Sequence, residues 1–211
     1  MLEREAKFVV DSAFELPDLA AAVRDASPAA PEVRQIRDTY YDTADLRLAR
    51  WGSTLRHRSG EGWTVKLPVD RGGSRLTRDE VRLSGDAGTP PTEALALVAS
   101  LTRGAEITAV ARIANSRLAL PWRDESGATV LELTDDAVHA QTPGARNVGF
   151  RELEVEIPPG TKASQLRRVS EALVAAGAAP SAPMPKVVRA LGDAAQQPPD
   201  VSVPVLGDEP T

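Results

Sequence analysis

The chain has 211 residues, a formal net charge of −5 and no cysteine. The length suits one large domain or two small ones. The acidic balance disfavours a nucleic-acid-binding surface, and the absence of cysteine excludes disulfides and thiolate metal ligands. The charged start lacks the apolar region of a signal peptide, and no apolar run approaches the roughly 18 residues of a membrane span. We therefore expect a soluble, cytoplasmic protein with neither a nucleic acid nor a membrane as partner.

The first half of the chain is dominated by short segments in which residue type alternates, a pattern typical of β-strands. Glycines at 60, 62, 72 and 73 supply turns between three of these segments, which predicts a series of hairpins. Between the first two strands, the sequence DLAAAVRDA predicts a short helix. The expected strands are 2–10, 34–42, 53–59, 63–69 and 76–84, and the expected helix is 18–26.

The second half alternates helices with longer strands. Apolar residues at helical spacing predict helices at 93–102 and 163–176, and strands are expected at 106–120, 128–134 and 148–157. After residue 192 the chain becomes rich in Pro, Asp and small residues. This change predicts one domain over 1–192 followed by a disordered tail or linker over 193–211.

Charged side chains recur at every second position of several predicted strands. In the last strand Glu152, Glu154 and Glu156 alternate with Leu153 and Val155, so one face is charged and the other apolar. An open sheet with helices over its apolar face would satisfy this pattern. A barrel with its charges inside would satisfy it equally well, and periodicity alone does not choose between the two.

The chemistry of these faces favours a bound cation and a bound anion. Carboxylates at alternate positions repel one another, and oxygen ligands of this kind suit a hard cation such as Mg²⁺ or Mn²⁺. Lysine and arginine at alternate positions suit an anion with several oxygens. Together, the two sets predict a site for a metal–polyphosphate complex.

Several motifs in order along the chain resemble the CYTH, or triphosphate tunnel metalloenzyme, superfamily. The opening Glu3-Arg4-Glu5-Ala6-Lys7 is similar to its Glu-x-Glu-x-Lys signature. The later matching segments are 40–43, 55–58, 63–68, 78–80, 152–156 and 185–191. The resemblance implies an α+β fold, in which an eight-stranded closed antiparallel β-barrel forms a triphosphate tunnel and helices pack outside it.

The resemblance also implies roles for individual residues. The substrate-binding cations would be Lys7, Arg56, Arg58, Lys66, Arg78, Arg117 and Lys186. The metal-side carboxylates would be Glu3, Glu5, Glu80, Glu132, Asp136, Glu152, Glu154 and Glu156. Lys7, Glu154 and Glu156 would take part directly in catalysis. Asn115 stands where the family often has a basic residue, and we expect Arg112 to be the nearest cation that compensates.

The expected reaction is metal-dependent hydrolysis of inorganic triphosphate or a related triphosphate, with Mg²⁺ or Mn²⁺ as cofactor. Three alternatives remain open: a thiamine triphosphatase, a class IV-type adenylyl cyclase, and a non-catalytic polyphosphate-binding or sensing module. In this superfamily the tunnel domain is often followed by a histidine-rich helical CHAD domain. The chain has only two histidines and no such segment, so we expect an excised or stand-alone tunnel domain. A CHAD-type helical domain, fused or associated, is the expected partner.

Overall fold

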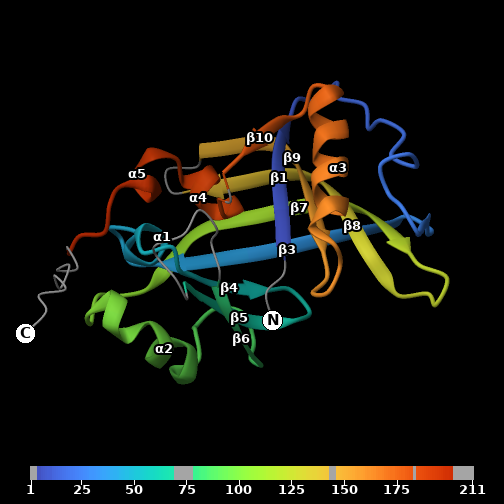
Figure 1. The fold of residues 1–211 in the computed structure, drawn as a ribbon. Coiled ribbons are helices and arrows are strands. Elements are labelled where there is room, and N and C mark those ends of the chain that lie inside the picture. Colours follow the sequence, from blue (N-terminus) through green and yellow to red (C-terminus); the bar gives the residue numbers. More distant parts are fainter. Residues whose placement is uncertain (1–3, 69–77, 143–145, 183, 202–211) are drawn as a thin grey trace, which may run out of the picture.

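The computed structural model describes residues 4–68, 78–142, 146–182 and 184–201, with the side chain of Arg78 outside this description. These residues form one antiparallel sheet with five helices around it (Figure 1). The strands are β1 (Arg4–Val10), β2 (Ser27–Pro28), β3 (Glu32–Asp42), β4 (Thr54–Arg58), β5 (Gly62–Pro68), β6 (Arg78–Leu83), β7 (Thr108–Arg123), β8 (Thr129–Thr142), β9 (Arg146–Ile157) and β10 (Ala179–Ser181). The helices are α1 (Arg47–Arg50), α2 (Thr92–Thr102), α3 (Ala163–Ala175), α4 (Lys186–Leu191) and α5 (Asp193–Gln196).

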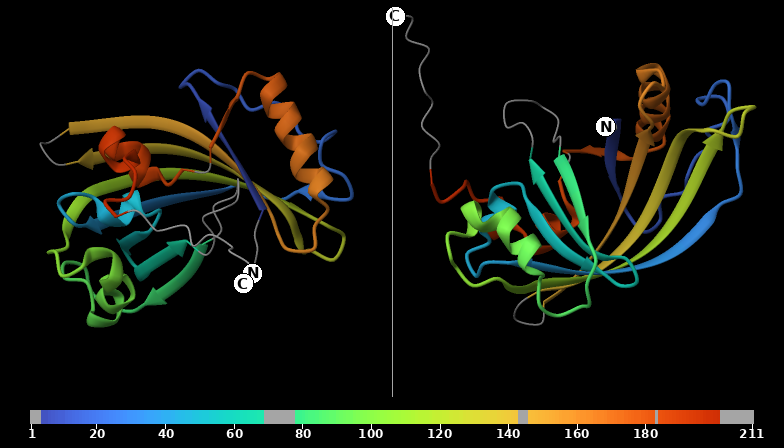
Figure 2. Two further views of the ribbon diagram at one scale, coloured as in Figure 1. Left: turned by 60° about the vertical axis from the view of Figure 1, so that its left-hand side comes forward. Right: turned by 90° about the horizontal axis from the view of Figure 1, so that it is seen from below.

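The strands follow the spatial order β10-β1-β9-β8-β7-β3-β4-β5-β6, and β2 pairs separately with β7. All eight predicted strands are present, as β1 and β3 to β9, while the unpredicted β2 and β10 contain only two and three residues. The sheet is strongly curved (Figure 2). Over the described residues, however, no ladder joins β6 to β1, so the predicted closure is not present there. The free edge of β1 is instead paired with β10 from Lys7 to Val9.

The apolar faces of the strands are buried under helices, which agrees with the predicted outer helices. On one half of the sheet, Leu153 and Val155 of β9 pack in a cluster with Leu173 of α3. On the other half, Leu55 and Trp63 pack with Val98 of α2. Burial of these side chains, several of them wholly inaccessible, supplies the main stabilising free energy of the fold.

Helix α4 lies on the opposite, charged face of the sheet and was not predicted. Its Val187 and Val188 pack against Ile113 of β7 and Val138 of β8. These two strand residues share a face with the charged positions Arg117 and Asp136, because side chains two apart on a strand point the same way. The charged face therefore has an apolar end, and α4 covers it.

The helix predicted at 18–26 is absent, although Val23 N–H does donate to the Leu19 carbonyl as in a helical turn. Tertiary contacts take the remaining backbone groups. The amide of Gln165 in α3 bonds both the N–H and the carbonyl of Arg24, and Arg168 donates to the Ala22 carbonyl. The segment therefore packs as an irregular loop against α3.

The start of the predicted tail is ordered in the structure. Residues 193–196 form α5, and the Pro198 carbonyl accepts hydrogen bonds from the Arg50 guanidinium. The Asp200 carboxylate pairs with Arg103 and accepts a hydrogen bond from the indole of Trp51. Residues up to 200 are thus held against α1 and the end of α2, which differs from the predicted disorder. Residues 202–211 lie outside the described part.

Candidate functional site

Charged residues of eight described strands, β1 and β3 to β9, share one face of the sheet, the same face on which α4 lies. Register pairs Lys7 of β1 with Glu154 of β9, and Glu152 of β9 with Asp136 of β8. Asp136 in turn lies opposite Arg117 of β7. Directly opposed residues in adjacent strands point to the same face, so these side chains converge. We refer to this surface as the inner face.

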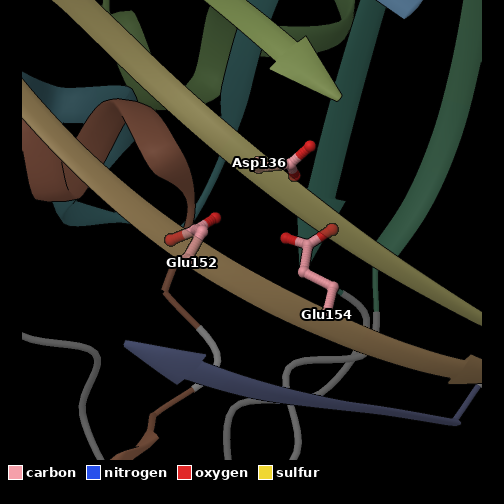
Figure 3. Close-up of side chains that lie close together, drawn as sticks. All are labelled: Asp136, Glu152 and Glu154. Carbon is pink, nitrogen blue, oxygen red and sulfur yellow. The ribbon is translucent and has the colours of Figure 1, made fainter. Parts of the chain in front are cut away.

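Three carboxylates form the buried centre of the inner face: Asp136, Glu152 and Glu154, which we call the acidic trio. One carboxylate oxygen from each lies within 4.8 Å of the others. The side chains point toward one another from β8 and β9 (Figure 3). Asp136 and Glu152 are almost wholly inaccessible, with relative exposures of 0% and 1%. Carboxylates this close and this buried need positive charge between them.

Four basic side chains surround the acidic trio. Lys186 Nζ lies 2.7 Å from Glu152 Oε1, 2.8 Å from Glu154 Oε1 and 2.9 Å from Asp136 Oδ2. The remaining contacts come from Lys7 to Glu154 at 2.6 Å, from Arg117 to Asp136 at 2.7 Å and to Glu154 at 3.1 Å, and from Arg189 to Glu152 at 3.5 Å. Each carboxylate of the acidic trio is thus paired with at least two of the four cations.

The pairing fixes the charge state of the cluster. Burial opposes ionisation of Glu154, but the charges of Lys186 and Lys7 outweigh it and hold the pKa of Glu154 well below its ordinary value. Burial likewise opposes the charge on Lys186, but Glu154 and Asp136 raise the pKa of Lys186 above its ordinary value. Asp136 is buried too, yet the hydrogen bonds from Arg117 and the charge of Lys186 lower its pKa. All three groups are therefore charged at neutral pH.

Among the described residues, two buried oxygens of the cluster have no hydrogen-bond partner: Asn115 Oδ1 and Thr134 Oγ1. The buried Glu152 carboxylate has its two cations, Lys186 and Arg189, as its printed contacts. A buried acceptor without a donor costs about 1–3 kcal/mol. Carboxylate and amide oxygens are the donors that Mg²⁺ and Mn²⁺ prefer, so the acidic trio and its neighbours fit a hard divalent cation.

A second row of carboxylates crosses the same strands one step further out. Glu5 of β1 lies opposite Glu156 of β9, and Glu156 lies opposite Glu132 of β8. Glu5 is exposed, and Lys7 Nζ lies 3.9 Å from its carboxylate. This outer row gives the inner face a further group of oxygen donors toward solvent.

On the same inner face, further along the sheet at β3 and β4, two arginines share one carboxylate. Arg58 donates two hydrogen bonds to Asp38 of β3, at 2.8 and 3.0 Å, and Arg56 donates one at 3.0 Å. Asp38 is 7% exposed. A planar guanidinium held in this way keeps a fixed orientation, and it carries more N–H groups than one carboxylate can engage.

Beyond these arginines, Lys66 of β5 lies opposite Glu80 of β6, and their side chains form an ion pair at 2.7 Å. Arg82 contacts the same carboxylate. Partial burial would raise the pKa of Glu80, but hydrogen bonds from Lys66 and Arg82 lower it to about 2. This group is more exposed than the acidic trio and forms the outer margin of the inner face.

The structure brings most of the predicted site residues together on one face, and their roles remain predictions. Glu3 and the Arg78 side chain lie outside the described residues. The prediction for Arg112 is wrong, because Arg112 is exposed on the opposite face: it lies five residues before Arg117, and an odd separation along a strand reverses the face. Asn115 does belong to the cluster, where its amide donates to Asp136 at 2.9 Å.

Sequence reasoning missed Asp38 and Arg189 as parts of the site. Asp38 stands in a strand whose inner positions mix charged and apolar types, so no charge pattern marks it. Arg189 lies on the unpredicted α4, three residues after Lys186, a spacing that places both on one side of a helix.

Asp42, in the matched segment 40–43, has a structural role. Its carboxylate accepts hydrogen bonds from the backbone N–H groups of Thr43, Leu48 and Ala49, at 2.7–2.9 Å. Burial nonetheless raises the pKa of Asp42. The contacts fix the turn from β3 into α1, and they place no charge on the inner face.

Residues 1–173 match the family model described as the CYTH domain. The chain belongs to the CYTH family. This finding agrees with the motif residues Glu5, Lys7, Glu152, Glu154 and Glu156, all of which lie on the inner face. No described helix is long and apolar enough to cross a membrane.

Similar proteins add the following. Two uncharacterized proteins from different strains of Mycobacterium tuberculosis are each 32% identical to the chain over 212 aligned positions, which cover 90% of the chain and 40% of the relative. The chain therefore spans well under half the length of these relatives. The crystal structure of a putative adenylate cyclase from Bacillus halodurans is similar with a TM-score of 0.53 and 19% identity. The similarity covers 89% of this chain and 96% of the Bacillus halodurans chain, and it shows that the two share a fold.

Proposed function

We propose that this CYTH domain is a metal-dependent hydrolase of inorganic triphosphate or a related triphosphate. The observation that carries the proposal is the inner face itself, where buried carboxylates interlock with Lys7, Arg117 and Lys186 on one side while Arg56 and Arg58 stand on the other. Such a surface provides several cations at different points for a ligand with several anionic oxygens.

Each part of the inner face has a distinct task in this proposal. Arg56 and Arg58, oriented by Asp38, would bind non-bridging phosphate oxygens. Lys7 and Arg117 would hold the reacting phosphoryl group and stabilise the negative charge that develops on it. Glu154 and Glu156 would orient the attacking water, and Glu156, which lies outside the acidic trio, would accept its proton. A bound Mg²⁺ or Mn²⁺ would supply Lewis-acid stabilisation of phosphoryl oxygens, held by oxygens of the acidic trio or of the outer row.

The donor set favours recognition of the phosphate chain itself. Ammonium and guanidinium groups pair with phosphate oxygens and do not discriminate between the groups attached to them. Inorganic triphosphate, which presents only such oxygens, is therefore the substrate that we propose first. A thiamine triphosphatase, a class IV-type adenylyl cyclase and a binding module without turnover are the alternatives that the experiment must separate.

The test is phosphate release from inorganic triphosphate, pyrophosphate and ATP with Mg²⁺ or Mn²⁺. We expect metal-dependent release from triphosphate and little from pyrophosphate. Glu154→Gln should lower turnover about 10- to 100-fold, whereas Glu171→Gln, at an exposed position of α3, should leave it unchanged. Cyclic AMP as the product from ATP would identify a cyclase, and triphosphate binding without release at any pH would identify a binding module.

A further inference from the structure

Lys186 occupies the centre of the acidic trio. Its ammonium lies 2.7–2.9 Å from one oxygen of each of the three carboxylates. The same three residues have ligand atoms close enough together to hold a metal ion. The ammonium thus lies where a cation shared by Asp136, Glu152 and Glu154 would lie.

A second cation cannot share this position. Mg²⁺ takes oxygen ligands at about 2.0–2.1 Å, so an ion bound by these carboxylates would be within a few ångströms of the ammonium. At such distances two positive charges repel by several kcal/mol even in a partly screened interior. Steric overlap adds to the repulsion, because each carboxylate oxygen that contacts Lys186 would have to turn toward the ion.

The attachment of Lys186 allows it to leave without unfolding the sheet. It is the first residue of α4, a helix of six residues that follows Pro185. The helix is held on the sheet by Val187, Val188 and Ala190, which are all buried. The four-carbon side chain of a lysine can rotate away from the acidic trio while those three residues keep their contacts.

We propose that Lys186 is an internal counter-cation that fills the cation position of the acidic trio and withdraws when a metal–polyphosphate complex enters. The inference rests on the proposed function and refines it. Entering phosphate oxygens would give the displaced ammonium a new anionic partner, whereas a metal ion alone would not. Divalent cation and polyphosphate should therefore bind cooperatively, each raising the affinity for the other.

The test measures Mn²⁺ binding without any phosphate, by electron paramagnetic resonance of the free ion. Lys186→Met removes the ammonium and keeps most of the side-chain volume, so the dissociation constant for Mn²⁺ should fall at least about 10-fold, which corresponds to about 1.4 kcal/mol. Lys162→Met is the matched control, because Lys162 is exposed at the start of α3. That variant should bind Mn²⁺ as the wild type does.

A second measurement uses the wild-type chain, in case Lys186→Met does not fold. Acetylation of individual lysines, followed by peptide mass spectrometry, reports whether an ammonium is buried in an ion pair. We expect Lys186 to react slowly in buffer and at least about 10-fold faster with saturating Mn²⁺ and no phosphate, because its carboxylate partners are then engaged by the ion and no phosphate oxygen replaces them. Lys162 should react at the same rate in both conditions.

The outcomes separate this inference from the proposed function. If triphosphate is hydrolysed but Lys186→Met binds Mn²⁺ no more tightly than wild type, or Lys186 stays protected in the Mn²⁺-loaded protein, the inference is overturned and the hydrolase stands. If neither the wild-type protein nor the Lys186→Met variant binds Mn²⁺, the inference is overturned as well. If Lys186 controls Mn²⁺ affinity but no substrate is hydrolysed, the inference stands and the hydrolase is contradicted.

Discussion

At the scale of single residues, Asp38 shows how a carboxylate can prepare a surface for anions. It pairs with Arg56 and Arg58, which are two residues apart on β4 and therefore point to the same face. Without that carboxylate, two guanidinium groups so close together would repel each other and turn toward solvent. Asp38 therefore keeps both arginines directed along the inner face.

Arg56 provides the corresponding prediction. Arg56→Ala removes one charge-assisted contact, worth about 1.5–3 kcal/mol, so the dissociation constant for triphosphate should rise about 10- to 100-fold. Isothermal titration calorimetry measures the effect. Arg37→Ala is the control, because Arg37 is exposed on the opposite face of β3. Equal affinities of the two variants would exclude Arg56 from the binding surface.

The sequence also shows at this scale what can be predicted from a pattern. The alternation of Glu152, Glu154 and Glu156 with apolar residues predicts both the strand and the side to which the glutamates point, because that periodicity is local. The contacts of Glu152 with Lys186 and Arg189 cannot be predicted in the same way. Those residues come from another element, and only tertiary packing brings them onto β9.

At the scale of elements, segments that span several of their own periods were predictable, and the short helix α4 was not, because a strand repeats every two residues and a helix only every 3.6. Helix α3 and the long strand β9 carry clear periodic patterns over many residues, whereas α4 has six residues between Pro185 and Gly192. Such a short segment gives too few turns for a periodicity to appear. The prediction of a helix at 18–26 failed for the opposite reason. Its composition favours a helix, but side chains of α3 form hydrogen bonds with its backbone groups instead.

Helix α3 provides a prediction about stability. Leu173 is wholly buried between α3 and the outer face of the sheet, so Leu173→Ala should lower the free energy of unfolding by about 2–5 kcal/mol. Val174→Ala, at a position that is 46% exposed, should change it by less than about 1 kcal/mol. Urea unfolding followed by circular dichroism gives both values. Similar losses in the two variants would contradict the packing of α3 described above.

At the scale of the whole molecule, the sheet reverses the usual distribution of residue types. Its apolar faces carry α2 and α3 on the outside, while its charged faces meet on the inside and are neutralised by one another and by α4. The sequence predicted two faces for every strand, but it could not predict whether the sheet closes. Closure depends on which partner the edge of β1 takes, and that partner is the three-residue β10.

Acid should therefore destabilise the molecule. The carboxylates of Glu154, Asp136 and Glu80 have pKa values below their ordinary values, the last of them at about 2 instead of 4.5. Such groups bind fewer protons when folded than when unfolded, so their stabilisation is complete above about pH 4.5 and is lost as the pH falls toward 2. The urea midpoint should be constant from pH 7 to 5 and fall steeply below 4.5. Glu80→Gln should make that decline shallower, and an unchanged midpoint at pH 3 would contradict the assigned ion pairs.

The open edge of the sheet has a consequence for how the protein behaves at high concentration. In the described part of the chain, β6 pairs on one side only, with β5. An unpaired strand is a template onto which another chain can add and start aggregation. Within its six residues, β6 carries Arg78, Asp79, Glu80 and Arg82. Charges at this density discourage stacking of one molecule on the next, so the strand that leaves the sheet open also protects it from self-association.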